Sequence, residues 1–294
     1  MMPFAVAGVQ MTVVIGDNMP RVREKLAFTM AVYPWVQMVV FSELAVFGPD
    51  TRLAQALPGP VEQELCELAK HYGIWLVPGS LYEHAEGGVI YNTTPVIAPD
   101  GTVVARHRKL FPFTPYEVGV KAGDTWVVFD VPEVGRFGVS ICYDMWFPET
   151  SRSLACMGAE VLIHPSLTGT IDRDVELSIG RATAAQNQMF VFDINGCGVG
   201  GNGQSQVIAP TGEILYRAGR SEEVIPIEID LDRVRRSREV GLRGLGQPLK
   251  SFRDREIEFP AYPKSEANLQ QLQKLGPLAK PQRGSRAGID LRGQ

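Results

Sequence analysis

Hydrophobic positions along the chain follow two patterns, short apolar runs and longer stretches with helical spacing. The apolar runs predict β-strands, and several are apolar at almost every position, as expected of strands buried on both faces. We expect strands over residues 4–14, 36–41, 74–81, 89–97, 102–108, 126–131, 137–142, 161–164, 191–194, 205–208 and 213–216. We expect helices over residues 20–32, 60–71, 148–157 and 175–188, and a short charged helix or turn over 232–239. This alternation indicates mixed sheets covered by helices, an α/β fold.

A short internal repeat indicates that the fold has two related halves. Residues 96–101 read VIAPDG and residues 207–212 read VIAPTG, each between two strand-like runs. In both, proline sets φ and glycine supplies a positive φ, which is typical of a hairpin turn. A helix and a strand precede each hairpin, so we favour two similar halves that each contribute one sheet to a sandwich. Two unrelated hairpins with similar turn residues are the alternative.

Composition narrows the function classes. The 294 residues are 45% hydrophobic and carry a net charge of −4, which argues against a dominant nucleic-acid or membrane-surface role. No apolar run reaches the roughly 18 residues of a membrane-spanning helix, and residues 1–10 lack the features of a signal peptide. The four cysteines lie too far apart for CxxC pairs, so we expect free thiols in a reducing cytoplasm. We therefore expect a soluble cytoplasmic enzyme.

The pattern of the chain changes after Asp232. The glycine-rich GLRGLGQ and four prolines follow, and residues 278–294 are basic without apolar periodicity. We therefore expect a globular domain over residues 1–235 and a C-terminal extension over 236–294, whose last stretch, 278–294, is an extended arm or a disordered tail.

Cys142 is the strongest candidate for chemistry. It ends the strand predicted over 137–142, and Pro148 with Glu149 marks a helix start soon afterwards. Exposed N–H groups and a helix dipole at such a junction favour a thiolate relative to the usual pKa of about 8.5. They can also hold an oxyanion. The alternative is a buried and inert thiol.

A nucleophilic cysteine needs a base, and the chain offers two kinds. Among four histidines, His164 alone sits at a strand end, so a Cys142–His164 dyad is one possibility. His107 lies in the basic run ARHRK and is expected at a solvated strand end. Glu43 follows the buried run VVF, where partial desolvation would raise the pKa of its carboxyl toward neutrality. An ordinary capping or ion-paired glutamate is the alternative for Glu43.

The other candidates are unremarkable when each is taken alone. Lys109 ends a strand in ARHRKLF and Glu117 lies in TPYEVG, and both are compatible with solvated surface residues. Cys66 and Cys156 fall in predicted helices, where helix packing accounts for them. Cys197 lies in a glycine-rich turn and has no assigned role.

Residues 4–230 resemble the carbon–nitrogen hydrolase (nitrilase) superfamily. The motifs that carry the resemblance are VVFSEL (39–44), RHRKLF (106–111), PYEVG (115–119), ICYDMWFPETSR (141–152), RATAAQNQ (181–188) and GQSQVIAPTGEIL (203–215). Among them the Cys-Tyr-Asp…Phe-Pro-Glu…Arg block is the most specific.

The resemblance implies a role for each candidate. Cys142 matches the nucleophile, Glu43 the general base, Lys109 the cation that stabilises the oxyanion, and Glu117 a second glutamate, although the loop before Glu117 varies in the family. His164 matches no catalytic position. The implied fold is a four-layer α-β-β-α sandwich of two pseudo-symmetric halves. Family members form homodimers or larger oligomers with C-terminal arms across the interface, and they need neither metal nor organic cofactor.

The residues after Cys142 narrow the implied substrate. Tyr143-Asp144 resembles amidase-type members, whereas nitrilases resemble Cys-Trp-Glu, and members that act on carboxylates often carry arginine where this chain has Trp146. We therefore expect an amidase that cleaves a neutral, hydrophobic or aryl amide to an acid and ammonia through a thioester. Tyr143, Trp146 and His164 are the expected substrate contacts, and plain packing is the alternative for Trp146. Hydrolysis of an N-carbamoyl amine or amino acid, nitrile hydrolysis and a catalytically inactive scaffold subunit stay open.

Overall fold

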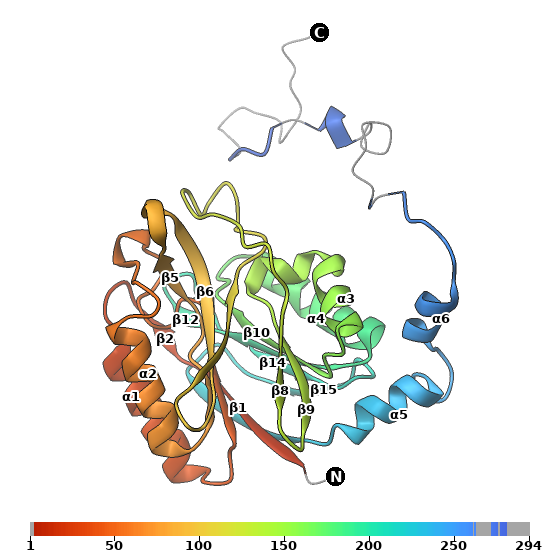
Figure 1. Ribbon diagram of the computed structural model, residues 1–294, viewed down its shortest axis with the longest axis horizontal. Coiled ribbons are helices and arrows are strands. Elements are labelled where there is room, and N and C mark those ends of the chain that lie inside the picture. Colours follow the sequence, from red (N-terminus) through yellow and green to blue (C-terminus); the bar gives the residue numbers. More distant parts are fainter. Residues whose placement is uncertain (1–2, 261, 263–271, 276, 281–294) are drawn as a thin grey trace.

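The structure is a computed structural model that describes residues 3–260, 262, 272–275 and 277–280. Two β-sheets lie face to face, and helices cover the outer face of each (Figure 1). The helices α1 (Met19–Val32) and α2 (Pro60–Tyr72) cover one sheet, and α3 (Pro148–Cys156) and α4 (Asp172–Asn187) cover the other. The predicted α-β-β-α sandwich is therefore confirmed.

The two sheets repeat one strand arrangement. The first contains, in spatial order, β16 (Glu223–Ile229), β1 (Phe4–Gln10), β3 (Met38–Phe41), β4 (Trp75–Val77), β6 (Ile90–Ile97) and β5 (Leu81–His84), with β7 (Val103–Arg108) paired to β6. The second contains β15 (Ile214–Arg217), β14 (Gln206–Ile208), β11 (Phe190–Asn195), β10 (Val161–Ser166), β9 (Gly135–Val139) and β8 (Val127–Val131). A small third sheet joins β13 (Gly201–Asn202), β12 (Cys197–Gly198) and β2 (Thr12–Val13). Short 3-10 helices occupy Thr51–Leu53, Glu86–Gly88, Cys142–Trp146 and Leu272–Lys274.

Strand directions show the pseudo-symmetry. The strands β1, β3 and β4 are parallel, as are β9, β10 and β11, and an antiparallel strand flanks each trio, β16 in the first sheet and β8 in the second. The repeated VIAPDG and VIAPTG segments form the turns of the hairpins β6–β7 and β14–β15. Both hairpins follow a helix and a strand, as the repeat predicted.

Alternate residues of the central strands supply three apolar layers. In β10, Val161 and Ile163 point into the core between the sheets, while Leu162 points toward α3 and α4. In β3, Val40 points between the sheets and Val39 toward α1 and α2. Strands buried on both faces explain the nearly continuous apolar runs of the sequence.

Three strand predictions need correction. The strand expected over 4–14 is interrupted at Met11, and the one over 74–81 is interrupted over 78–80, where Gly79 adopts a φ of +78°. The strand β16 was not predicted at all. It lies at the edge of its sheet, where Pro226 is tolerated because it opposes Ala7 on only one side.

The segment after β16 packs on the second half before leaving it. The helix α5 (Asp232–Val240) crosses the predicted boundary at residue 235, and Gln188 donates to the carbonyl of Ser237. The helix α6 (Pro248–Asp254) follows, and the described chain beyond it leads away from the sandwich (Figure 1). Residues 281–294 of the predicted tail lie outside the described residues. None of the described helices is long and apolar enough to cross a membrane.

Candidate active site

A pocket of about 330 Å³ opens where strands of both sheets end. Glu43 follows β3, Lys109 follows β7, Cys142 begins the turn after β9, and Thr168 follows β10. The carboxyl ends of parallel strands are the usual position for a site in an open α/β sheet. The fold therefore brings Glu43, Lys109, Glu117 and Cys142 to one pocket, although 99 residues of sequence separate the first from the last.

One ammonium group joins two carboxylates in this pocket. Lys109 Nζ lies 2.8 Å from Glu43 Oε1 and 2.7 Å from Glu117 Oε2, and all three side chains are almost fully buried. Asn92 Nδ2 donates to the same two residues, at 2.9 Å to Glu43 and 3.1 Å to Glu117. The backbone N–H of Phe113 adds a further hydrogen bond to Glu117 at 2.6 Å.

Burial and neighbouring charges shift the pKa values of this cluster in different directions. Burial raises the pKa of Glu43, and the negative charge of Glu117 adds to the increase, against the opposing effect of Lys109. For Glu117, burial acts in the same direction, but Lys109 and several hydrogen bonds outweigh it and lower the pKa. Burial also opposes the charge of Lys109, yet its anionic neighbours hold its pKa well above the usual value.

Cys142 starts a single 3-10 turn with its backbone in the left-handed region. Its φ is +45°, a conformation that L-residues adopt at a cost of about 1–3 kcal/mol and that is concentrated at functional sites. The expected lowering of its thiol pKa is not what the structure shows. Burial raises that pKa, and the Glu43 carboxylate adds to the rise more than Lys109 offsets it.

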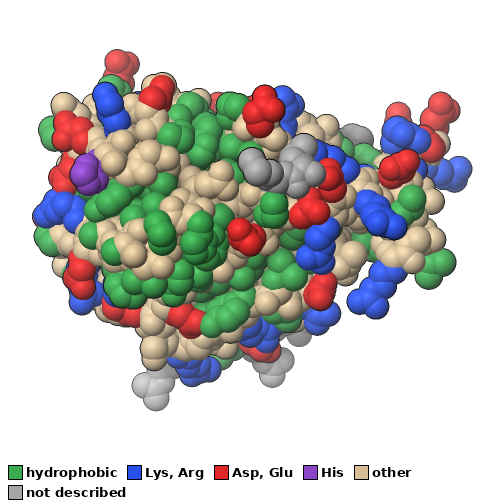
Figure 2. All heavy atoms as spheres, turned by 90° about the horizontal axis from the view of Figure 1, so that it is seen from below, with side chains coloured by type: hydrophobic (Ala, Val, Ile, Leu, Met, Phe, Trp, Pro, Cys, Tyr) green, Lys and Arg blue, Asp and Glu red, His purple; other side chains and the backbone are tan. Residues whose placement is uncertain are grey.

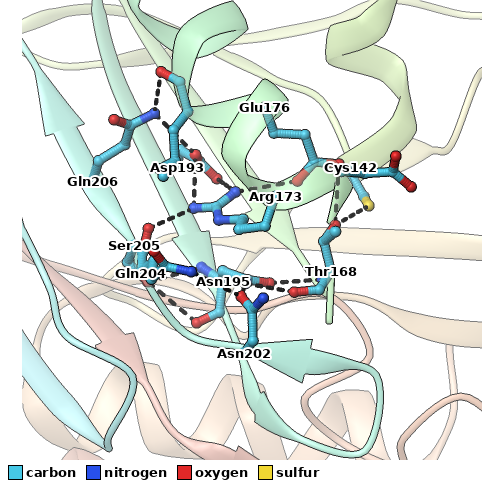
Figure 3. A network of polar contacts seen from close by, with 12 residues as sticks. Cys142, Thr168, Arg173, Glu176, Asp193, Asn195, Asn202, Gln204, Ser205 and Gln206 are labelled. Carbon is cyan, nitrogen blue, oxygen red and sulfur yellow. Dashed lines mark hydrogen bonds and ion pairs between the residues drawn. The ribbon is translucent and has the colours of Figure 1, made fainter. Parts of the chain in front are cut away.

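A second buried cluster lies beside Cys142 (Figure 3). Thr168 Oγ1 lies 3.6 Å from Cys142 Sγ and donates to Glu176 Oε1 at 3.1 Å. The indole of Trp146 donates to the same oxygen at 3.1 Å. Arg173 Nη1 lies 3.3 Å from Glu176 Oε2, and Arg173 Nη2 lies 2.9 Å from Asp193 Oδ2.

These additional residues were not predicted from the sequence. Glu176 and Arg173 lie on α4, where a charged residue is usually solvated. Burial raises the pKa of Glu176 despite the guanidinium beside it.

His107 is not at a solvated strand end. It is fully buried, and its Nε2 lies 3.0 Å from Asp144 Oδ2. Asp144 also accepts hydrogen bonds from the backbone N–H groups of Ile141 and Phe111. Because Ile141 precedes Cys142, this carboxylate fixes the turn that carries the thiol. In β7 the side chains alternate, so the inward position of Lys109 places His107 on the same buried face.

The three predicted substrate contacts divide into two groups. Tyr143 and Trp146 line the pocket, together with the rings of Phe113 and Tyr116. His164 is buried, bonds to Ser140 Oγ at 2.7 Å and does not line the pocket. Burial lowers its pKa to about 4, so it is neutral near pH 7. The structure therefore places His164 outside the pocket, away from both a substrate contact and a dyad with Cys142.

The four cysteines occupy different environments and are all unpaired. Cys66 is half-buried in α2, as helix packing requires. Cys156 is exposed at the end of α3, so the expectation of a packing role is wrong for this residue. Cys197 is buried in β12, and its thiol donates to the carbonyl of Arg220 at 3.3 Å.

Among the described residues, no group of three or more His, Cys, Asp or Glu side chains has a metal-binding arrangement.

Comparison with known proteins identifies the family. The sequence profile of the carbon-nitrogen hydrolase family matches residues 5–239. The chain belongs to this family. It is thus a hydrolase of carbon–nitrogen bonds, of the amidase type that the residues after Cys142 indicated.

Several named relatives are amidases. An omega-amidase of Xenopus laevis is 34% identical over 204 residues, which cover 63% of this chain and 72% of the relative. A formamidase of Bacillus cereus is 30% identical over 230 residues, covering 73% and 68% of the two chains. The crystal structure of Saccharomyces cerevisiae Nit3, a member of branch 10 of the nitrilase superfamily, superposes with a TM-score of 0.74 at 28% identity. That match covers 81% of this chain and 93% of Nit3.

Proposed function

We propose that this carbon-nitrogen hydrolase cleaves a small neutral amide to a carboxylic acid and ammonia, through a thioester on Cys142. The observation that carries the proposal is the buried ammonium of Lys109 held between Glu43 and Glu117 in the pocket that contains the thiol. The names of the omega-amidase and formamidase relatives support the same reaction class.

Acylation begins with proton transfer from Cys142 to Glu43. The sulfur forms a bond to the amide carbon, and the carbonyl π electrons move to oxygen. Lys109 Nζ and the backbone N–H of Tyr143 stabilise this oxyanion, and electrostatic stabilisation of that kind is usually the largest contribution to catalysis. When the oxyanion collapses, the C–N bond breaks and Glu43 gives its proton to the nitrogen, which leaves as ammonia.

Deacylation uses the same residues in the reverse order. Glu43 takes a proton from water, and the resulting hydroxide attacks the thioester carbon. The C–S bond then breaks, the acid leaves, and the proton returns from Glu43 to the thiolate. One base thus serves both half-reactions, which requires a carboxyl whose pKa lies above its usual value, as burial provides for Glu43.

The aromatic lining of the pocket favours a hydrophobic or aryl acyl group. Phe113 and Tyr143 have ring centroids 5.0 Å apart, and Tyr143 and Trp146 have centroids 6.0 Å apart. Tyr116 completes this aromatic wall. Rings in this arrangement bury flat or aliphatic groups and leave the carbonyl to the polar end of the pocket.

Ammonia release from matched substrates tests the proposal. We expect hexanamide and benzamide to yield ammonia and hexanenitrile and benzonitrile to yield none. Intact-mass analysis of acid-quenched enzyme should show an acyl adduct on Cys142. Cys142→Ala should abolish turnover with an unchanged melting temperature, whereas Cys156→Ala, at an exposed thiol, should keep full activity.

Turnover by Cys142→Ala would contradict the mechanism, and preferential nitrile turnover would indicate a nitrilase. Faster turnover of N-carbamoyl compounds would indicate a carbamoyl hydrolase, and slow iodoacetamide labelling without any turnover would indicate a scaffold.

A further inference from the structure

The charged residues that line the pocket are mostly acidic. They are Glu43, Lys109, Glu117, Asp172 and Glu176. The single lysine already contacts two of the carboxylates, and its role in the proposed reaction is to hold the oxyanion. Among the described residues that line the pocket, no second cation is left to pair with a carboxylate at the far end of a substrate. Lys280, whose ammonium lies 4.9 Å from the centroid of the Tyr116 ring, is not one of the lining residues.

Glu176 brings one of these negative charges close to the reacting atoms. Its carboxylate contacts Thr168 Oγ1, which in turn lies 3.6 Å from Cys142 Sγ. In the proposed reaction an acyl group attached to that sulfur occupies the pocket, and the pocket lining includes Thr168, Glu176 and Trp146, whose indole donates to Glu176. Glu176 thus lies beside the acyl chain a few atoms from the scissile bond.

The arginine behind Glu176 does not neutralise this wall of the pocket. Arg173 is 1% exposed, does not line the pocket, and is shared between Glu176 and Asp193. Arg173 carries one positive charge against the two carboxylates of Glu176 and Asp193, and because burial raises the pKa of Glu176, the cluster is anionic at pH values above that pKa. Asp172, at the start of α4, adds a further carboxylate to the lining.

Aromatic rings complete the surroundings of this acidic wall. Phe113, Tyr116 and Trp146 line the same pocket. Rings beside carboxylates form a good environment for an alkylammonium group, because the ring faces attract cations and the carboxylates accept its hydrogen bonds. The same surroundings repel a carboxylate at short range.

We propose that Glu176, supported by Asp172, determines the charge of the accepted substrate: an amide or carbamoyl compound whose remote end is an ammonium group. A substrate ending in a carboxylate is excluded. This inference rests on the proposed amidase function and refines its substrate from a neutral amide to one with a cationic end.

Three compounds of nearly equal size separate the alternatives. They are 4-aminobutanamide, whose amine is protonated at neutral pH, the neutral succinamide, and succinamate, which carries a carboxylate. Rates of ammonia release should give kcat/KM values that decrease in this order, with at least a tenfold difference between the first compound and the last. Equal or faster turnover of succinamate by the natural enzyme would overturn the inference.

Variants that neutralise one carboxylate then test which residues cause the preference for a cationic substrate. Glu176→Gln and Asp172→Asn should each reduce the preference for 4-aminobutanamide over succinamate at least threefold, and the double variant should reduce it further. Asp174→Asn is the matched control, because Asp174 lies in the same first turn of α4, is exposed and does not line the pocket. Asp172→Asn keeps the test valid if Glu176→Gln, at a buried site, perturbs folding. An unchanged preference in both variants would contradict the assignment.

The design separates this inference from the proposed function. If hexanamide is hydrolysed and 4-aminobutanamide is not, the charge preference is wrong while the amidase function stands. If no amide in either set releases ammonia, the proposed function itself fails.

Discussion

Replacing Glu117 by glutamine should move the acidic limb of the pH profile to lower pH. The perturbation removes one negative charge from the buried cluster and keeps the shape of the side chain. Glu117 raises the pKa of Glu43 because the two carboxylates face each other across one ammonium group. Without that charge the pKa of Glu43 falls, and Glu43 reaches its active, ionised form at a lower pH.

The geometry gives the size of the effect. Distances of 2.8 and 2.7 Å to the shared Lys109 nitrogen mean that the two carboxylate oxygens are no more than about 5.5 Å apart. At an effective dielectric constant of about 20, two unit charges at that distance repel by about 3 kcal/mol, equivalent to about two pKa units. The glutamine keeps part of the hydrogen bonding, so we expect the acidic limb to move by about 1 to 2 pH units.

The assay is kcat/KM for a neutral amide between pH 4 and pH 9, since kcat/KM reports the ionisation of the free enzyme. Tyr82→Phe is the matched control, because Tyr82 donates a hydrogen bond to Glu117 at 3.4 Å and its removal changes no charge. We expect the control to keep the natural profile. An acidic limb that stays in place or moves to higher pH in Glu117→Gln would refute the electrostatic coupling of the two glutamates.

Two further predictions concern the turn and the assembly. Asp144→Ala should lower the free energy of unfolding by about 3 kcal/mol, because it leaves His107 and two backbone N–H groups without their buried partner. Urea denaturation measures this change, and Asp130→Ala, which removes an exposed ion pair, is the control that should leave the free energy of unfolding nearly unchanged. We also propose that the chain forms a homodimer or larger oligomer through its C-terminal segment, in which Phe252, Ile257 and Phe259 are exposed. Hydrophobic side chains also gather on one face of the sandwich (Figure 2). Light scattering should then report a smaller oligomer for a chain ending at residue 247, and an unchanged mass would exclude that segment from the interface.

The sequence predicted the layers of the fold because local patterns determine them. Continuous apolar runs identified strands such as β3 and β10, and the repeated turns identified the two hairpins. The strand β16 escaped prediction because its partner β1 lies more than 200 residues earlier, and no local pattern encodes that pairing. Its proline and its edge position further weaken the strand signal.

Within the site, the sequence motifs predicted the functional residues that follow buried strands. They did not predict the residues inside a strand or helix that only the tertiary fold brings to the site. Glu43 and Cys142 follow buried strands, so position and resemblance agreed on them. Asn92 lies inside β6, and Glu176 lies on a helix face that looks solvated in sequence. Only the tertiary fold shows that Asn92 bonds to both Glu43 and Glu117.

The directions of the pKa shifts support the proposal that Glu43 carries out the proton transfers. Lys109 cannot serve as the acid, because its neighbours hold its pKa well above the usual value and keep it cationic. Glu117 has a lowered pKa and remains an anion through the cycle. Glu176 has a raised pKa, but it reaches the Cys142 sulfur only through the hydroxyl of Thr168. Glu43 alone combines a raised pKa with a direct place beside the thiol. It can therefore accept the proton of Cys142 and return it to the leaving group, while Lys109 stabilises charge without exchanging a proton.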